Sequence, residues 1–483
     1  MKKIILSICI AGLGFISVSA QKSIDQKVTD LMAKMTLEEK IGQLNQYNDD
    51  ITATGPVTKD ADKAGQVRAG KLGSILNAVG VKNTRNWQDQ AMQSRLKIPL
   101  LFGQDVIHGF RTTFPIPLGE TATWDMNLIE KSARIAATEA SAYGIHWTFA
   151  PMVDIGRDPR WGRVMEGAGE DTYLGSLVAK ARVKGFQGNG LGNLDAVMAC
   201  TKHFAAYGAG VGGRDYNSVD MSLRQLNETF LPPYKATVEA GVATFMNSFN
   251  DINGIPATGN KYIQRDLLKG SWGFKGFVVS DWGSIGEMIP HGFAKDNKDA
   301  ALKAIIAGSD MDMESRSYIN HLADLVKEGK VDIKFIDDAV RRILTKKYEL
   351  GLFDNPYKFN DEKREKEQTN NLEHRKFARE IGAKSIVLLK NQTQLLPLSK
   401  TTKKVAIIGP FAKATVDNHG FWSIAFPDDN QRIITQFDGI KAQLDKNSEL
   451  LYAKGCNVND KDTSLFAEAV ETAKKADVVI MTL

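Results

Sequence analysis

Short apolar runs alternate with helical stretches along most of this chain, and that alternation restricts its fold more than any other feature. Runs rich in aliphatic and aromatic residues, without polar alternation, read as buried strands. Repeated strand–helix units form a parallel sheet with right-handed crossovers. The sequence therefore predicts an α/β protein whose main domain, residues 21–356, is a (β/α)8 TIM-like barrel. The expected strands are Leu72–Asn77, Ile98–Gly103, His146–Ala150, Ala196–Thr201, Val242–Ser248, Phe277–Ser280 and Ala304–Met311.

Helical periodicity marks the segments around these runs. The N-terminal segment, Val28–Gln46, reads as a helix that restarts at Thr36, where Glu39 completes a capping box. We expect the last barrel helix to close at Gly351, because Pro356 prevents its continuation. The other expected helices are Leu128–Tyr143, Leu174–Gln187, Tyr234–Ala240 and His321–Lys327.

A second α/β pattern follows the barrel. Residues 357–373 form a charged linker, and residues 374–483 are expected to be part of an α/β sandwich. Val405–Ile408 reads as a strand there, and Val478–Leu483 reads as a central buried strand that ends the sequence. A central strand without a following element would leave an apolar edge uncovered. We therefore expect this domain to be incomplete and the chain to be a piece of a longer protein.

The first twenty residues have the pattern of a secretory signal peptide. Two lysines begin it, an apolar run covers Ile4–Val18, and small residues precede Gln21. The apolar run is short for a membrane anchor, and no later run is long enough to span a bilayer. We expect residues 1–20 to be removed and the protein to be periplasmic or secreted, without a membrane span.

Composition excludes several other classes of protein. The net charge of +5 is spread without basic blocks, so no nucleic-acid partner is expected. Cys9 lies in the signal peptide, and Cys200 and Cys456 are far apart in the sequence, which argues against a disulfide framework. A homodimer is compatible with the sequence.

Asp281 is the first charged residue after the apolar run Phe277–Ser280. The residue that follows a strand of a parallel barrel lies at the mouth, where such barrels carry their catalytic groups. A carboxylate held there beside Trp282 is a candidate nucleophile. The alternative interpretation is a helix N-cap, for which aspartate is a favoured residue.

Other charged residues also follow expected strands. Asp105, Asp154 and the pair Lys202–His203 each come after such a run, as Asp281 does. Because the carboxyl ends of barrel strands converge on one mouth, these groups would line a single pocket. Carboxylates and cations together suit a neutral ligand rich in hydroxyl groups.

Each of these groups also has a structural interpretation. Arg157, Arg160 and Arg163 are expected to belong mostly to a salt-bridged loop, and Lys202–His203 is compatible with a buried polar pair. The glycine-rich segment Gly208–Gly213 lacks the Gly-Lys-Ser/Thr of a phosphate loop. Neither His-Glu-x-x-His nor Cys-x-x-Cys occurs, so no metal or organic cofactor is expected.

Five motifs occur in order along the chain: Gly103–Gly109, Arg157–Tyr173, Lys202–Gly208, Ser280–Gly283 and Gly308–Met313. Together these motifs resemble those of glycoside hydrolase family three, and within it the periplasmic bacterial β-glucosidases. Their order and consistent spacing make the resemblance specific, and it covers essentially the whole chain after residue 20.

The resemblance implies a retaining exo-β-glucosidase acting on β-linked glucosides or oligosaccharides. It implies that Asp281 is the nucleophile that attacks the anomeric carbon. It also implies a set of substrate-binding residues, with one departure, since the family often has tyrosine where this chain has Phe249. The implied substrate-binding residues are Asp105, Arg163, Lys202, His203, Met246 and Trp282.

The resemblance leaves the general acid unassigned in this chain. In the glucosidase branch the acid is a glutamate of the second domain, on a loop after a strand like Val478–Leu483, so we expect it beyond residue 483. The N-acetylglucosaminidase branch is disfavoured, because its histidine motif is replaced here by Ala205–Gly208. A β-xylosidase or broad β-glycosidase, a non-catalytic sugar-binding fragment and a metal-dependent barrel hydrolase are the alternatives.

Overall fold

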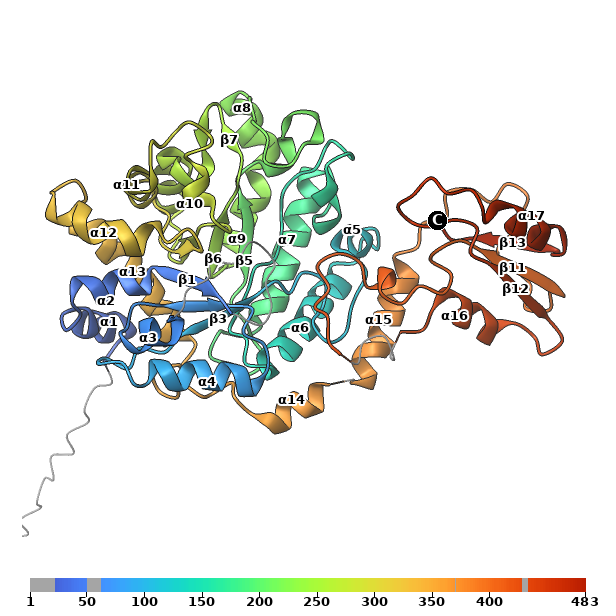
Figure 1. Cartoon of the computed structure of the whole chain (residues 1–483), viewed down its shortest axis with the longest axis horizontal. Coiled ribbons are helices and arrows are strands. Elements are labelled where there is room, and N and C mark those ends of the chain that lie inside the picture. The colour runs from blue at the N-terminus through green and yellow to red at the C-terminus, as the bar shows by residue number, and fades with distance from the viewer. Residues whose placement is uncertain (1–21, 50–61, 370, 428–432) are drawn as a thin grey trace, which may run out of the picture.

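The computed structural model describes residues 22–49, 62–369, 371–427 and 433–483. The expected signal peptide, residues 1–20, lies outside this range. Figure 1 shows a large α/β body with a smaller α/β layer beside it, and helix α15 lies between the two. No helix in the described ranges has both the length and the apolar character needed to cross a bilayer.

Parallel strands close into a barrel in the described part of the main body. One sheet has the order β10-β1-β2-β3-β4 and another the order β5-β6-β9. Parallel bridges Trp147–Met198 and Val279–Met311 join the two sheets on both sides, so the predicted TIM-like barrel is confirmed. Its strands are β1 (Asn45–Asn48), β2 (Ser74–Leu76), β3 (Leu101–Gln104), β4 (Trp147–Thr148), β5 (Cys200–Phe204), β6 (Thr244–Asn247), β9 (Phe277–Val279) and β10 (Asp312–Met313).

Helices surround this barrel and bury their apolar faces against it. In α13, for example, Ile336, Val340 and Ile343 are fully buried at helical spacing. A small hairpin of β7 (Asp251–Ile252) and β8 (Ile255–Pro256) lies outside the ring. The barrel helices are α1 (Ile24–Met32), α2 (Leu37–Gln43), α3 (Lys63–Arg68), α4 (Val81–Ala91), α5 (Pro117–Thr121), α6 (Met126–Ala142), α7 (Thr172–Gln187), α8 (Leu223–Gln225), α9 (Pro232–Glu239), α10 (Ser284–Glu287), α11 (Asn297–Ala307), α12 (Ser317–Lys327) and α13 (Ile333–Glu349).

Three predictions of secondary structure were wrong in part. Ala304–Met311 is not a strand, because helix α11 continues to Ala307 and β10 comes after Met311. The expected helix Val28–Gln46 is two helices followed by strand β1, although the capping box at Thr36 is confirmed. Lys202 and His203 lie within β5 and not after it.

The second layer has the strand order β12-β11-β13 in its described part, with all pairs parallel. β13 lies at one edge of the sheet in the described residues, and the central position expected for Val478–Leu483 in the whole domain stays a prediction. Alternate residues of β13, Val479 and Met481, are exposed. The elements are α14 (Glu362–Gln368), α15 (Leu372–Lys384), β11 (Lys404–Ile408), α16 (Gln436–Gln443), β12 (Glu449–Ala453), α17 (Phe466–Lys474) and β13 (Val478–Met481).

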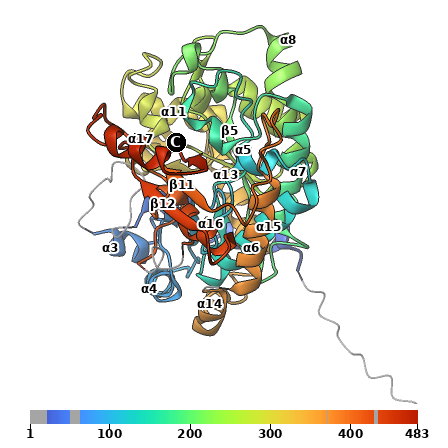
Figure 2. The same cartoon turned by 90° about the vertical axis from the view of Figure 1, so that its right-hand side faces the viewer.

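One segment of the second layer contacts the barrel, whose α5 and α6 lie behind this layer in Figure 2. The imidazole Nε2 of His108 lies 2.7 Å from the carbonyl oxygen of Phe421. The next residue, Trp422, places its ring 5.2 Å from the ammonium group of Lys202 on β5. These contacts place an aromatic segment of the second layer beside a buried cation of the barrel.

Candidate active site

A pocket of about 700 Å³ opens at the carboxyl ends of the barrel strands. Asp105 follows β3, Lys202 lies in β5, Met246 lies in β6 and Asp281 follows β9. Such a position is where parallel barrels build their ligand sites. The remaining lining residues are Leu76, Phe149, Arg163, Asp215, Tyr216, Phe249, Trp282, Gly283, Gly286, Glu287, Pro290, Met313, Glu314, Phe421 and Trp422.

Asp281 presents a carboxylate that is only 13% exposed. Its Oδ1 accepts a 2.7 Å hydrogen bond from the backbone amide of Trp282, which fixes the orientation of the carboxylate. Burial raises the pKa of Asp281 to about 6, although the charges of Arg163 and Lys202 act in the opposite direction. The carboxylate is therefore ionised at neutral pH, as a nucleophile must be.

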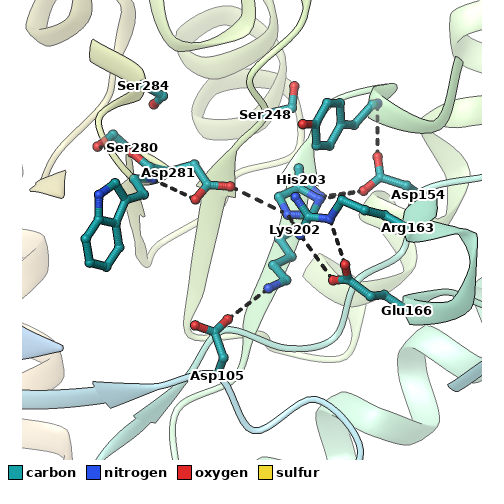
Figure 3. A network of polar contacts seen from close by, with 12 residues as sticks. Asp105, Asp154, Arg163, Glu166, Lys202, His203, Ser248, Ser280, Asp281 and Ser284 are labelled. Carbon is teal, nitrogen blue, oxygen red and sulfur yellow. Dashed lines mark hydrogen bonds and ion pairs between the residues drawn. The ribbon is translucent and has the colours of Figure 1, made fainter. Parts of the chain in front are cut away.

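Asp105 and Lys202 form a buried ion pair across the pocket (Figure 3). The ammonium group of Lys202 donates to Oδ1 of Asp105 over 3.0 Å, and the lysine side chain is 2% exposed. The second oxygen of Asp105 points away from Lys202 in Figure 3. A carboxylate and an ammonium in this arrangement can together bind vicinal hydroxyl groups of a ligand.

Arg163 is held by a bidentate contact with the buried Glu166. The guanidinium donates to the two carboxylate oxygens over 2.7 and 3.1 Å. Burial opposes ionisation of this pair, but the charge of Arg163 outweighs it and lowers the pKa of Glu166. The planar guanidinium is therefore fixed in place with one edge toward the pocket.

His203 lies behind Arg163 and is not part of the pocket wall. Arg163 donates to its Nε2 over 2.8 Å, so the ring proton is on Nδ1, which donates to Asp154 over 2.9 Å. Burial and the charge of Arg163 hold the pKa of His203 well below its usual range. Because Nε2 carries no proton, its 3.5 Å approach to Asp281 is not a hydrogen bond.

Asp154 holds this histidine in turn. Tyr234 donates its hydroxyl to Oδ1 over 2.6 Å, and the backbone amide of His203 donates to Oδ2 over 2.8 Å. Burial raises the pKa of Asp154 to about 6, against these hydrogen bonds. The sequence placed Asp154 after a strand, and its role as the partner of His203 was visible only in the structure.

We call Asp105, Arg163, Lys202 and Asp281 the pocket floor, and each of them was predicted from the sequence. Met246 and Trp282 also line the pocket as predicted. His203 contacts Arg163 and Asp154, and its predicted contact with the ligand stays a prediction.

Aromatic residues form much of the rest of the pocket lining. The rings of Tyr216 and Phe249 pack at a tilt of 46° with 4.5 Å between their centroids. Burial and the charge of Asp281 raise the pKa of Tyr216 to about 12, so its hydroxyl remains protonated. We call Tyr216, Trp282, Glu287 and Trp422 the pocket rim. Apart from Trp282, these residues carry no periodic signal that would have identified them in the sequence.

Charged residues elsewhere in the described ranges form no candidate metal centre. No group of three or more His, Cys, Asp or Glu side chains there is placed to hold a metal ion. Asp158 and Arg160 pair with each other at the surface over 2.6 Å, so they belong to the structural loop that the sequence indicated. His146 is buried away from the pocket, beside Phe102 and Phe359.

Two family models match successive parts of the chain. The model of the glycosyl hydrolase family 3 N-terminal domain matches residues 36–346. The model of the family's C-terminal domain matches residues 386–483. The chain belongs to glycosyl hydrolase family 3.

Individual relatives agree with this membership. A periplasmic beta-glucosidase of Salmonella typhimurium is 42% identical over 94% of this chain and 62% of its own length. A beta-xylosidase of Formosa agariphila is 33% identical over 96% of this chain and 61% of its own length. The solved beta-glucosidase of Listeria innocua in complex with isofagomine superposes with a TM-score of 0.88 at 38% identity, over 95% of this chain and 63% of that one. The chain thus spans somewhat less than two thirds of each of these relatives.

Proposed function

We propose that this protein is a retaining exo-β-glucosidase that releases terminal non-reducing β-D-glucosyl residues through a glycosyl ester on Asp281. The observation that carries the proposal is the position of this carboxylate at the floor of a pocket that also holds Lys202, Asp105 and Arg163. Retention of configuration requires a carboxylate nucleophile on one face of the sugar and an acid on the other. Asp281 meets the first requirement.

The chemistry at the floor follows from its charges. An oxygen of Asp281 forms a bond to the anomeric carbon as the bond to the leaving oxygen breaks, and water later cleaves the ester. Asp105 accepts hydrogen bonds from hydroxyls of the bound sugar, and Lys202 and Arg163 donate to them. These groups are fixed before the substrate arrives, so they stabilise the developing oxocarbenium ion without reorganisation.

Two comparisons support glucose as the substrate. The Salmonella relative is named a beta-glucosidase, and the Listeria neighbour has been solved in complexes with glucose, gluconolactone and isofagomine. The Salmonella protein is also named periplasmic, which supports export of this one as residues 1–20 predict. β-Linked glucosides or oligosaccharides are accordingly its proposed ligands.

A β-xylosidase is the second candidate, because several relatives carry that name. The floor residues recognise ring hydroxyls and do not distinguish glucose from xylose at the C5 substituent. Aryl β-glucoside and aryl β-xyloside should be compared at equal enzyme concentration. We expect the larger kcat/KM with the glucoside, and the opposite order would favour the xylosidase.

Covalent trapping tests the nucleophile directly. A fluorinated glucosyl inactivator, which slows hydrolysis of the ester, should label the protein with one sugar, and peptide mass spectrometry should find it on Asp281. An adduct on another residue would overturn the assignment. Stoichiometric sugar binding with neither labelling nor turnover would indicate a sugar-binding protein instead.

A further inference from the structure

His108 belongs to the same sequence motif as Asp105, and the proposed reaction gives it no role. The two residues lie three positions apart on the loop that follows β3. Asp105 is part of the pocket floor, whereas the His108 side chain is 3% exposed and contacts the second layer. One loop of the barrel therefore carries both a floor carboxylate and a contact to the other layer.

Two carbonyl oxygens face the His108 ring. Its Nδ1 lies 2.9 Å from the oxygen of Phe114 in the barrel, and its Nε2 lies 2.7 Å from the oxygen of Phe421 in the second layer. Burial lowers the pKa of His108, so the ring is neutral near neutral pH. A neutral imidazole has one N–H group, and a carbonyl oxygen only accepts hydrogen bonds. The ring therefore donates to one of the two oxygens, and the shorter distance favours Nε2 as the donor.

The backbone around Phe421 is shaped to present its oxygen to this donor. Gly420 and Trp422 flank it with φ angles of +73° and +63°. We call residues 420–422 the aromatic turn. A residue with a side chain adopts such a φ only at an energetic cost, and the conformation persists where surrounding contacts hold it. The hydrogen bond from His108 is such a contact, because it fixes the peptide group between Phe421 and Trp422.

Trp422 connects the aromatic turn to the pocket floor. Its ring lies 5.2 Å from the ammonium group of Lys202, which in turn donates to Asp105. An aromatic face near a cation stabilises the charge. Farther along the segment, Phe426 packs against Phe110 with 5.5 Å between ring centroids, but apolar packing has no preferred direction. The hydrogen bond to the aromatic turn therefore fixes where the indole lies.

We propose that His108 is a positioning residue that holds the aromatic turn of the second layer, and with it the Trp422 ring, over the Lys202–Asp105 pair. The expected effect on turnover rests on the proposed glucosidase function. His108 touches no substrate and acts through the Phe421 carbonyl group. Without its Nε2 donor the aromatic turn moves away from the barrel, and the floor loses the aromatic face beside its cation.

Two amide replacements separate the two contacts of His108 in the full chain. Glutamine places an N–H donor near the position of Nε2, and asparagine places one near the position of Nδ1. His108→Asn should lower kcat/KM for phenyl β-glucoside roughly 10–100-fold, and His108→Gln should recover most of that loss. A role confined to the barrel loop, through Phe114, would make asparagine the better replacement. That order, or equal activity of the two variants, would overturn the proposal.

His321→Asn is the matched control for these variants. His321 lies on α12, on the side of the barrel away from the second layer in Figure 1. The same chemical change there should leave kcat/KM at the wild-type value.

Gly420→Ala tests the aromatic turn from the other side of the contact. A Cβ at this position would lie 3.6 Å from Ile116 and 3.7 Å from the His108 ring, which is ordinary contact, so the change acts through the φ of +73°. We expect a loss of kcat/KM similar to that of His108→Asn, and little further loss in the double variant. Fully additive losses would mean that the two positions act independently and would overturn the proposal.

Two further measurements do not depend on turnover. Amide hydrogen exchange in the peptide that contains residues 420–424 should become roughly 10-fold faster in His108→Asn and stay near the wild-type rate in His108→Gln. Nitrogen NMR of the wild type should find a proton on Nε2 of His108, and a proton on Nδ1 alone would overturn the proposal. If both results are as expected but the wild type hydrolyses no β-glucoside, the glucosidase function fails and the positioning role stands. An active wild type whose exchange rates do not change in either variant would overturn the positioning role alone.

Discussion

The floor and the rim of the pocket are built in different ways. Three of the floor's four ionised groups lie in or just after barrel strands, and Asp105, Lys202 and Arg163 are ion-paired with each other or with Glu166. The rim is mostly aromatic, comes from loops, from α10 and from the second layer, and contains the carboxyl group of Glu287. Paired charges on strands are fixed in advance and suit the one sugar ring that every substrate shares. We therefore expect floor variants to impair all substrates alike and rim variants to discriminate among leaving groups.

Replacement of Asp281 should have the largest effect. Asp281→Asn removes the nucleophile and should reduce kcat by on the order of 10⁴-fold, with aryl glucosides and disaccharides alike. Asp324→Asn, at an exposed position of α12, is the matched control. Steady-state assays with both substrate types check this, and retention of activity with either type would contradict the comparison.

The same variant should gain stability. The folded pKa of about 6 lies above the usual 3.8, so the stability that Asp281 contributes is present below pH 3.8 and is lost as pH rises through 6. Asparagine does not ionise, so its contribution to stability does not fall as the pH rises. Asp281→Asn should therefore be more stable than the wild type at pH 7.5 by up to about 3 kcal/mol. Denaturant unfolding at pH 7.5 and pH 4 measures this, and the gain should shrink at the lower pH.

Lys202→Met should have the next largest effect. It leaves Asp105 buried without its cation, which typically costs about 3–5 kcal/mol of stability, and it should lower kcat/KM roughly 10²–10³-fold for every substrate. The acidic limb of the pH profile near pH 6 should move upward, because the positive charge of Lys202 lowers the pKa of Asp281. Lys327→Met, at the surface, is the control. If the acidic limb does not move, Lys202 does not influence the pKa of Asp281.

Asp105, Lys202 and Asp281 of the floor could be predicted from the sequence because they lie at or near the ends of barrel strands. Phe277–Ser280 is apolar and short, so the position of Asp281 at the mouth follows directly, and Asp105 follows β3 in the same way. Strand β1 could not be predicted in this manner. Its residues Asn45, Gln46 and Asn48 are polar yet fully buried inside the ring. Buried strands are recognised by runs of apolar residues, and β1 lacks such a run.

The rim residues, and the residues that support the floor, could not be predicted from the positions of strand ends. Trp422 reaches the pocket from the second layer, far away in the sequence, and no local pattern indicates that contact. The position of His203 behind Arg163 depends on three-dimensional packing around Asp154. Ala304–Met311 was misread because the alanine-rich end of α11 resembles a buried strand, while β10 is only two residues long.

Asp154→Asn tests how far the floor depends on the residues behind it. An amide at this position can donate to His203 Nδ1, which would move the ring proton to Nε2 and oppose the donation from Arg163. A displaced guanidinium should cost roughly 10–100-fold in kcat/KM with all substrates. Nitrogen NMR of the His203 ring should report the change of tautomer. Loss of activity with an unchanged tautomer would point to another cause.

Trp282→Ala should have the smallest effect on kcat/KM and the clearest difference between substrates. The indole forms one wall of the rim, and stacking of a sugar or aryl group on it is worth about 0.5–1.5 kcal/mol, or about 2–10-fold in kcat/KM. We expect that loss with a disaccharide and none with methyl β-glucoside, whose leaving group is too small to stack. Trp124→Ala, at a tryptophan that is 74% exposed, controls for loss of an indole elsewhere. Equal losses with both substrates would mean that Trp282 acts through the adjacent Asp281, whose carboxylate its backbone amide holds, and would place it with the floor.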